Sequence, residues 1–194
     1  MKRLIATFVT AFLTCAAPVT AAELGDDGLH KTDWMRDTFK DLPEDLAEAN
    51  AEGKRLLLIM EQRGCIYCDK MHAEVFPDPK VRQAIEENYF VVQLNLHGDI
   101  EITDFDGETL SEKAAARKWG ILFTPTMIFL PEEVPEGATA AQAAVATMPG
   151  AFGKGTTFDL LTWVAEQRYL TDPEEDFQRY HARMIVERNN GNTE

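Results

Sequence analysis

A continuous apolar run that leads directly into two closely spaced cysteines constrains the fold of this chain more than any other feature. The run is Leu56–Met60, and an uninterrupted apolar stretch of this length is typical of a strand buried on both faces. Cys65 and Cys68 follow it in the motif Gly-Cys-Ile-Tyr-Cys-Asp. We expect a helix to begin at the pair and to end at Pro77, because proline interrupts a helix. A strand followed by this cysteine spacing at a helix start is a fairly specific signal, whereas the spacing alone is weak.

The first 22 residues have the composition of an export signal. Lys2 and Arg3 provide a positively charged start, and Leu4–Leu13 is an apolar stretch too short to span a bilayer. Small residues then precede Glu23, where we expect cleavage. The sequence therefore predicts a signal peptide over 1–22 and a periplasmic protein.

The third cysteine, Cys15, lies within that predicted signal. The alternative is a lipoprotein anchored through Cys15, but Thr14 stands where lipoproteins have Gly, Ala or Ser, so a cleaved signal fits better. The mature chain would then keep Cys65 and Cys68 in an oxidising compartment. A purely structural disulfide is a further alternative, which we disfavour because closing so short a loop constrains little of the unfolded chain.

The chain is strongly acidic, with a formal net charge of −14. Because the predicted signal holds basic residues and no acidic ones, the mature protein is more acidic still. This charge argues against nucleic acid and anionic membranes as partners, and no later stretch is apolar for long enough to span a membrane. The roughly 170 residues that remain correspond to one domain of ordinary size.

Apolar patterning and cap residues divide the mature chain into three parts. They are an N-terminal extension (23–41) that begins as a loose tail, a central domain (42–171) and a C-terminal helical extension (172–194). We expect strands over 56–60, 89–96, 126–130 and 145–148. We expect helices over 43–51, 111–119 and 158–170, and two more that begin at residues 79 and 172. A hairpin is expected within 98–107 and a loop over 131–144. The alternation of strands and helices predicts an α/β fold with a central mixed sheet flanked by helices.

The position of each cysteine predicts its chemical role. A cysteine attacks only as the thiolate, and at a helix start Cys65 would face unpaired backbone N–H groups and the positive end of the helix dipole, which stabilise that form. Cys68 lies one turn along the same side, where it can attack a mixed disulfide formed at Cys65. We therefore expect Cys65 to be the exposed nucleophile and Cys68 the resolving thiol, with no cofactor besides this redox-active disulfide.

Several segments together make the chain resemble the thioredoxin superfamily from about residue 42 to 170. They are Leu56–Met60, Cys65–Cys68, Val92–Asn95, Arg117–Ile121 and Thr124–Thr126. The resemblance implies a thioredoxin fold with a cis-proline at Pro125, in a loop that lies beside the cysteines and pairs with an extended substrate. It implies substrate-binding roles for the residues around the cysteines and in that loop, namely Gly64, Ile66, Tyr67, Thr124 and Pro125. Within the superfamily, the stretch 98–112 and the Cys-x-Tyr-Cys-Asp pattern are most similar to periplasmic SoxW-type thioredoxins of sulfur-oxidation clusters.

Three departures from thioredoxins concern the surroundings of the pair. Gly64 replaces the usual Trp, and Ile66-Tyr67 replaces Gly-Pro. Thioredoxins also bury an Asp near a Lys of the next strand, and the corresponding residues here are Ile59 and Gln93. Glu61, two residues further along the strand, is the candidate proton acceptor for Cys68, and a solvated carboxylate at the strand end is an equal alternative. These departures leave the reduction potential open.

A metal site is the main alternative from a different functional class. Cys65, Cys68 and His72 fall at i, i+3 and i+7 of one helix, so three soft ligands would face one ion, as in a copper- or zinc-binding thioredoxin-like chaperone. No fourth ligand is evident, and His72 could equally cap the exposed side of the helix. We therefore assign no metal ligands.

Other conspicuous residues have simpler interpretations. We expect His30, His97 and His181 to lie on the surface and the tryptophans to lie in the core, namely Trp34, Trp119 and Trp163. The apolar stripe from Phe177 to Met184 is expected to pack back on the domain, with a partner-binding face as the alternative.

These features predict a periplasmic thiol–disulfide oxidoreductase that reduces protein or sulfur-carrier disulfides. Cys65 would attack the substrate disulfide and Cys68 would resolve the product. The resemblance implies a disulfide-containing protein as substrate and a membrane thiol-electron carrier as redox partner. A disulfide oxidase or isomerase is the alternative within the same class.

Overall fold

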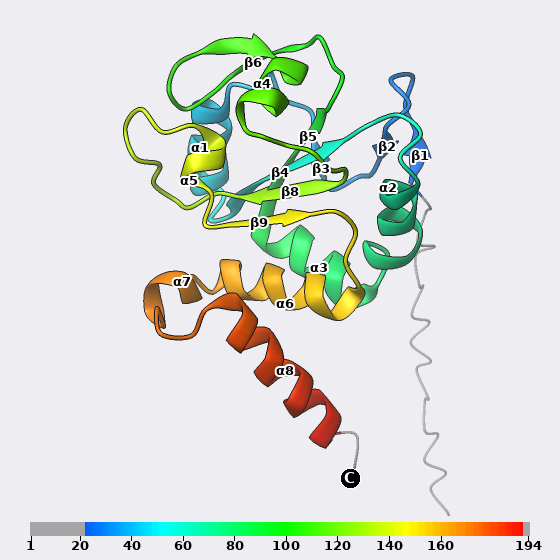
Figure 1. The fold of residues 1–194 in the computed structure, drawn as a ribbon, viewed down its shortest axis with the longest axis vertical. Helices are drawn as coiled ribbons and strands as arrows, with labels where there is room; N and C mark the ends of the chain where they lie inside the picture. The colour runs from blue at the N-terminus through cyan, green and yellow to red at the C-terminus, as the bar shows by residue number, and fades with distance from the viewer. Residues whose placement is uncertain (1–21, 192–194) are drawn as a thin grey trace, which may run out of the picture.

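A five-stranded mixed sheet forms the centre of the protein in the computed structural model, which describes residues 22–191. Its strand order is β3 (Met35–Arg36), β5 (Tyr89–Asn95), β4 (Arg55–Glu61), β8 (Thr126–Phe129) and β9 (Ala146–Pro149). The first three strands run parallel, and β8 and β9 each pair antiparallel to their neighbour. Figure 1 shows helices on both faces of this sheet, so the expected thioredoxin fold is confirmed.

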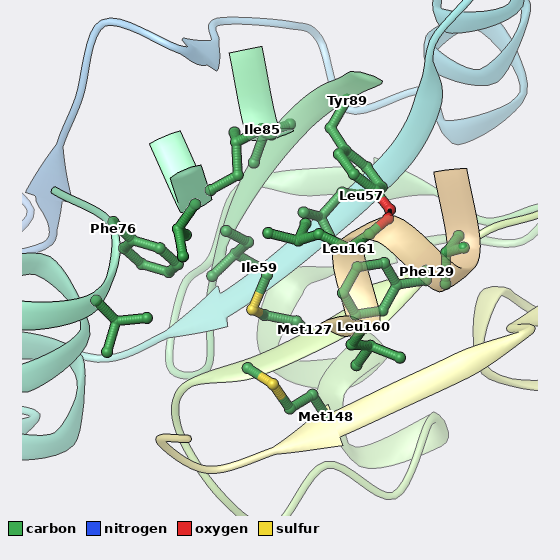
Figure 2. Packing of buried hydrophobic residues seen from close by; sticks show 14 of the residues in the cluster. Leu57, Ile59, Phe76, Ile85, Tyr89, Met127, Phe129, Met148, Leu160 and Leu161 are labelled. Atoms are coloured by element: carbon green, nitrogen blue, oxygen red, sulfur yellow. Dashed lines mark hydrogen bonds between the residues drawn. The ribbon is translucent and has the colours of Figure 1, made fainter. Parts of the chain in front are cut away.

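The alternation of side chains along β4 explains why its central stretch Leu56–Met60 is apolar throughout. Leu56, Leu58 and Met60 enter one core cluster with α1 (Leu42–Ala51), α4 (Glu112–Lys118) and α5 (Ala140–Ala143). Leu57 and Ile59 enter the other, which Figure 2 shows from close by. That second cluster includes side chains from η1 (Met71–Val75), α3 (Pro79–Asn88), α6 (Lys154–Ala165) and α8 (Phe177–Gly191). A strand covered on both faces needs apolar residues at every position.

The helix boundaries near the site follow from local capping. The Asp41 side chain accepts a hydrogen bond from the Glu44 N–H at the start of α1, and Asp78 does the same for the Lys80 N–H at the start of α3. Between them, α2 (Ile66–Lys70) begins at Cys65 and continues into the single π-turn of η1, which ends before Pro77. The expected helix start at the cysteine pair is therefore confirmed.

The N-terminal segment is not the loose tail that the sequence predicts. It forms a hairpin of β1 (Glu23–Leu24) and β2 (His30–Lys31), and β3 then joins the main sheet beside β5. Leu29 and Trp34 are buried, and burial of these two large side chains favours an ordered segment over a solvated one. The prediction was wrong because it rested on the many polar residues of 23–33 and gave no weight to the two large apolar side chains. The predicted signal, Cys15 included, lies outside the described residues except for Ala22.

Several boundaries elsewhere differ from the sequence prediction. The hairpin of β6 (Glu101–Thr103) and β7 (Thr109–Ser111) extends past residue 107, and the predicted loop contains α5, which a capping box of Thr139 and Gln142 starts. Helix α6 begins and ends earlier than predicted. Its earlier end follows from Gln167, which adopts φ 51° before the short α7 (Arg168–Thr171). The last helix begins at Phe177 and not at residue 172.

Helix α8 packs back on the domain, as the sequence predicts. Phe177, Tyr180 and Met184 join the core cluster that also contains α6. His181 is partly buried there, where its Nδ1 lies 2.5 Å from the carboxylate of Asp159, so its surface assignment was wrong. The three tryptophans are buried and His97 is exposed, both as predicted. Within residues 22–191, no helix is both long and apolar enough to span a bilayer.

Candidate functional site

Cys65 and Cys68 form a disulfide where the polypeptide leaves β4 and enters α2. Cys65 is the N-cap residue of the helix, and its sulfur accepts a hydrogen bond from the Cys68 N–H at 3.0 Å. Cys65 is 5% exposed and Cys68 is 0% exposed. Cys65 is thus the more accessible of the two, as the helix position predicts, but the expectation that it is exposed is wrong for this disulfide form.

The loop before β8 lies directly against the disulfide. The Thr124–Pro125 peptide bond is cis, and the Thr124 hydroxyl donates to Cys65 Sγ at 3.3 Å. The carbonyl of Pro125 accepts a hydrogen bond from the Gly150 N–H at 2.7 Å, which attaches the loop to the end of β9. Residues 59 positions apart in the sequence are therefore in contact at the site.

Large apolar side chains are exposed on both sides of this contact. Ile66 and Tyr67 belong to the first turn after Cys65, and Leu122 and Phe123 immediately precede Thr124. The sequence analysis assigned Ile66 and Tyr67 to substrate binding but missed Leu122 and Phe123. Two adjacent apolar residues next to a predicted substrate loop were the signal that could have identified them.

Glu61 is fully buried at the end of β4, so the alternative of a solvated carboxylate is wrong. Its Oε1 lies 2.9 Å from His72 Nε2, and its Oε2 accepts a hydrogen bond from Gln93 Nε2 at 2.6 Å. It lies on the same face of β4 as Ile59, because alternate residues of a strand point the same way. The buried carboxylate is thus displaced two residues along the strand, where it meets η1 and β5.

Two histidines stack beside this carboxylate, and both are more buried than the sequence analysis predicts. His72 is buried and does not cap the exposed side of the helix. Its ring stacks on that of His30, with centroids 4.4 Å apart and planes 14° apart. His30 Nε2 in turn lies 2.9 Å from Asp69 Oδ1. Burial lowers the pKa of His30, and the nearby His72 adds to this shift, while Glu61 and Asp69 oppose it.

The same residues have the composition of a metal site, but their arrangement does not suit one ion. His30, Glu61 and His72 each place a donor atom within 4.8 Å of the others. Imidazole nitrogens bind a metal in the ring plane, and two stacked planes only 14° apart meet far from both rings. The alternative set with Cys65 and Cys68 is not assembled either, since the two sulfurs bond to each other and His72 pairs with Glu61.

Comparisons with known proteins agree with the fold. The sequence profile of a thioredoxin-like domain matches residues 42–147. A thioredoxin-fold protein from Helicobacter pylori superposes with a TM-score of 0.52 at 18% identity, covering 71% of this chain and 86% of that one. A thioredoxin from Thermus thermophilus gives a TM-score of 0.48 at 26% identity, covering 64% and 83%. Among curated proteins, no relative matches the chain.

The arrangement is suited to thiol–disulfide exchange. A disulfide at a helix start, next to a loop with a cis proline, can accept electrons from a dithiol or, once reduced, donate them to another disulfide. The fold and the Cys65–Cys68 disulfide together support thiol–disulfide oxidoreductase activity.

Proposed function

Because this chain belongs to the thioredoxin-like domain family, we propose that it is a periplasmic reductant of protein disulfides that works through Cys65 and Cys68. The observation that carries the proposal is the disulfide at the N-terminus of α2, in contact with the loop of the cis Thr124–Pro125 bond. Both cysteines are held at a strand–helix junction, so reduction and reoxidation need no large movement of the fold.

The catalytic cycle follows from the position of each sulfur. In the reduced protein, the N–H groups that start α2 stabilise the Cys65 thiolate, which attacks a substrate disulfide and releases one substrate thiolate. Cys68 then loses its proton and attacks Cys65 Sγ. The new Cys65–Cys68 bond forms as the bond between Cys65 and the substrate breaks. The substrate leaves with two thiols, and the protein is left oxidised by two electrons.

Glu61 is the proton acceptor for Cys68 in this proposal. It is a fully buried carboxylate on the face of β4 against which η1, the continuation of the helix that carries Cys68, packs. Its two oxygens are oriented by His72 and Gln93. A base is needed because Cys68 is itself buried, and burial in apolar surroundings disfavours an isolated thiolate.

The substrate would be an extended, cysteine-containing segment of a protein. Ile66, Tyr67, Leu122 and Phe123 offer exposed apolar contacts on both sides of the disulfide. Gly64 and Thr124–Pro125 offer the backbone between them, with which a strand-like segment can pair. Specificity for protein disulfides over small ones would come from this combination of apolar surface and backbone pairing.

The proposal also specifies the direction of electron flow, the cellular compartment and the redox partner. The resemblance to SoxW-type thioredoxins supports a reductant that receives electrons from a membrane thiol carrier and passes them to enzymes of sulfur oxidation. The export signal in the sequence supports a periplasmic location.

Two measurements test the function. Equilibration with a glutathione series gives the reduction potential of the pair, and a value near −270 mV agrees with a reductant, whereas a value near −120 mV identifies an oxidant. Separately, Cys68→Ser should accumulate a mixed disulfide through Cys65, while the matched Cys65→Ser variant should not. If neither variant nor wild type exchanges disulfides with a protein substrate, the oxidoreductase assignment fails.

A further inference from the structure

We propose that His72 is a positioning residue that orients Glu61 for the resolving step through a hydrogen bond from its Nε2, and that His30, stacked on His72, holds that ring in place. The inference rests on the proposed function, in which Glu61 takes the proton of Cys68. It assigns a role to two histidines that come from the N-terminal hairpin and from the helix after the cysteines.

The first argument is the hydrogen bonding of the carboxylate. A buried carboxylate is stable in its charged form only when donors replace the lost water. Within residues 22–191, Glu61 has a nitrogen partner at each oxygen, His72 Nε2 at 2.9 Å and Gln93 Nε2 at 2.6 Å. Gln93 is itself fixed, since its oxygen accepts from Lys31 Nζ at 2.7 Å. Loss of the His72 donor would leave one carboxylate oxygen buried without a partner.

The second argument concerns the tautomer of His72. Its Nε2 faces a carboxylate and must carry the proton to bond with it, an assignment from the hydrogen-bond network. Its Nδ1 is buried and has no hydrogen-bond partner in the part of the chain that the structure describes. A proton on Nδ1 would be a buried donor without an acceptor, which is more costly than an unused lone pair. The arrangement therefore favours a neutral ring that donates through Nε2.

The third argument is the stack with His30. The two rings lie nearly parallel, with centroids 4.4 Å apart and planes 14° apart, so His30 restricts rotation of the His72 ring away from Glu61. Burial lowers the pKa of His30, so its ring packs there in the neutral form near pH 7. The charged groups that face the pair are Lys31 from β2, Asp69 from α2 and Glu61 from β4. Since Asp69 is exposed and bonds to His30, this side of the cluster connects it to solvent.

The chemistry of the step defines what His72 would affect. The S–H proton of Cys68 passes to the Glu61 carboxylate, and the Cys68 electron pair forms the bond to Cys65 Sγ. The bond between Cys65 and the substrate breaks, and its electron pair leaves on the substrate sulfur, which takes a proton from water. The carboxylate must present an oxygen to the Cys68 proton, so a residue that orients Glu61 affects this step and not the attack by Cys65.

The experiment compares His72→Phe, which keeps a stacking ring without a donor, with His72→Gln, which keeps an N–H donor. Reduced protein is mixed with dithiobis(nitrobenzoate). Release of the first thionitrobenzoate reports attack by Cys65, and release of the second reports resolution by Cys68. At pH 7 we expect His72→Phe to slow the second release about tenfold. We also expect the pH profile of the second release to shift from that of wild type, because this variant leaves one buried carboxylate oxygen without a donor. His72→Gln should remain within about twofold of wild type, as rescue by the donor requires.

Each other outcome has a distinct meaning. A wild-type pH profile in His72→Phe overturns the inference, and so does equal slowing in the two variants, which would indicate a packing role alone. Stoichiometric binding of zinc that His30→Ala abolishes would also overturn it, in favour of a metal site. If wild type releases no second thionitrobenzoate, the proposed function itself fails. Should His72→Phe not fold, Gln93→Met removes the other donor and must shift the profile from that of wild type.

Discussion

At the scale of single residues, the site has a buried carboxylate at a different position from the one that the resemblance to thioredoxins implies. The resemblance implies an acid at the position of Ile59, whereas this chain has Glu61, on the same face of the strand. The partner on the next strand is the neutral Gln93, which donates through its amide. The donors around the carboxylate therefore come from an amide and an imidazole, and the ammonium of Lys31 bonds to Gln93 instead of to the carboxylate.

Glu61→Gln should slow the resolving step about hundredfold near pH 7, because an amide cannot take the proton of Cys68. The attack by Cys65 should change far less, since that sulfur is stabilised by the start of α2. The two releases of thionitrobenzoate measure both rates. Glu74→Gln, an exposed carboxylate on η1, is the matched control. Equal rates in Glu61→Gln and wild type would contradict the assignment of Glu61.

A second buried carboxylate should affect stability and not chemistry. Burial raises the pKa of Asp45 in α1 to about 6, although the Thr38 hydroxyl opposes the shift. Because the folded state binds this proton more tightly than the unfolded chain, stability falls as pH rises from about 4 to about 6. We expect Asp45→Asn to stabilise the protein by about 2 kcal/mol at pH 7 and by much less at pH 4. Urea unfolding at both pH values measures this difference, and an equal effect at the two would contradict it.

At the scale of elements, α8 is attached to α6 by a buried ionic cluster as well as by apolar contacts. Arg188 donates to both oxygens of Asp159, at 2.6 and 2.9 Å, and His181 lies against the same carboxylate. Asp159 is buried, so its charge depends on these partners. The cluster explains why an amphipathic helix at the end of the chain packs on the domain.

Asp159→Ala should release α8 from the domain. Removing the carboxylate takes away the acceptor of the hydrogen bonds from Arg188, and because Arg188 is itself exposed we expect a loss of only about 2 kcal/mol in the free energy of unfolding. Hydrogen exchange should speed up in α8 before it does in α6. Glu187→Ala, which removes an exposed carboxylate of α8, should stay within about 0.5 kcal/mol of wild type. If hydrogen exchange in α8 is unchanged in Asp159→Ala, the apolar contacts alone hold α8 on the domain.

At the scale of the whole molecule, the N-terminal segment completes the site. The β1–β2 hairpin supplies His30, and Lys31 beside it reaches Gln93 on β5. Arg63, just before the cysteines, donates to the backbone carbonyl of Asp26 in the same hairpin. The segment between the expected cleavage point and the family domain is therefore part of the site, and a protein trimmed to residue 42 would lack it.

Expression with the full leader in a bacterium with a periplasm should give a mature chain that begins at Glu23. The reason is the short apolar stretch followed by small residues, which signal peptidase recognises. Mass spectrometry of the periplasmic fraction measures the new N-terminus. A chain that keeps Cys15 with a lipid attached would instead establish the anchored form.

The local sequence determined much of the fold, because its signals act over a few residues. The apolar run of β4, the cysteine spacing, the cap at Asp78 and the alternation of strands and helices each report a local preference, and the structure follows them. The CxxC disulfide lies within one helical turn, so its existence could also be foreseen. Tertiary contact was not required for any of these predictions.

Only the tertiary structure brought His30, Glu61, His72 and Gln93 together. They come from β2, β4, η1 and β5, and no pattern of the sequence connects four segments whose contacts span up to 63 positions. The sequence singled out Glu61 but left open whether it is solvated, and it indicated a surface position for His30, because burial is a property of what packs over a residue. The sequence alone thus determined the redox pair and its scaffold, whereas the packing of the hairpin against the sheet decided what surrounds the carboxylate behind it.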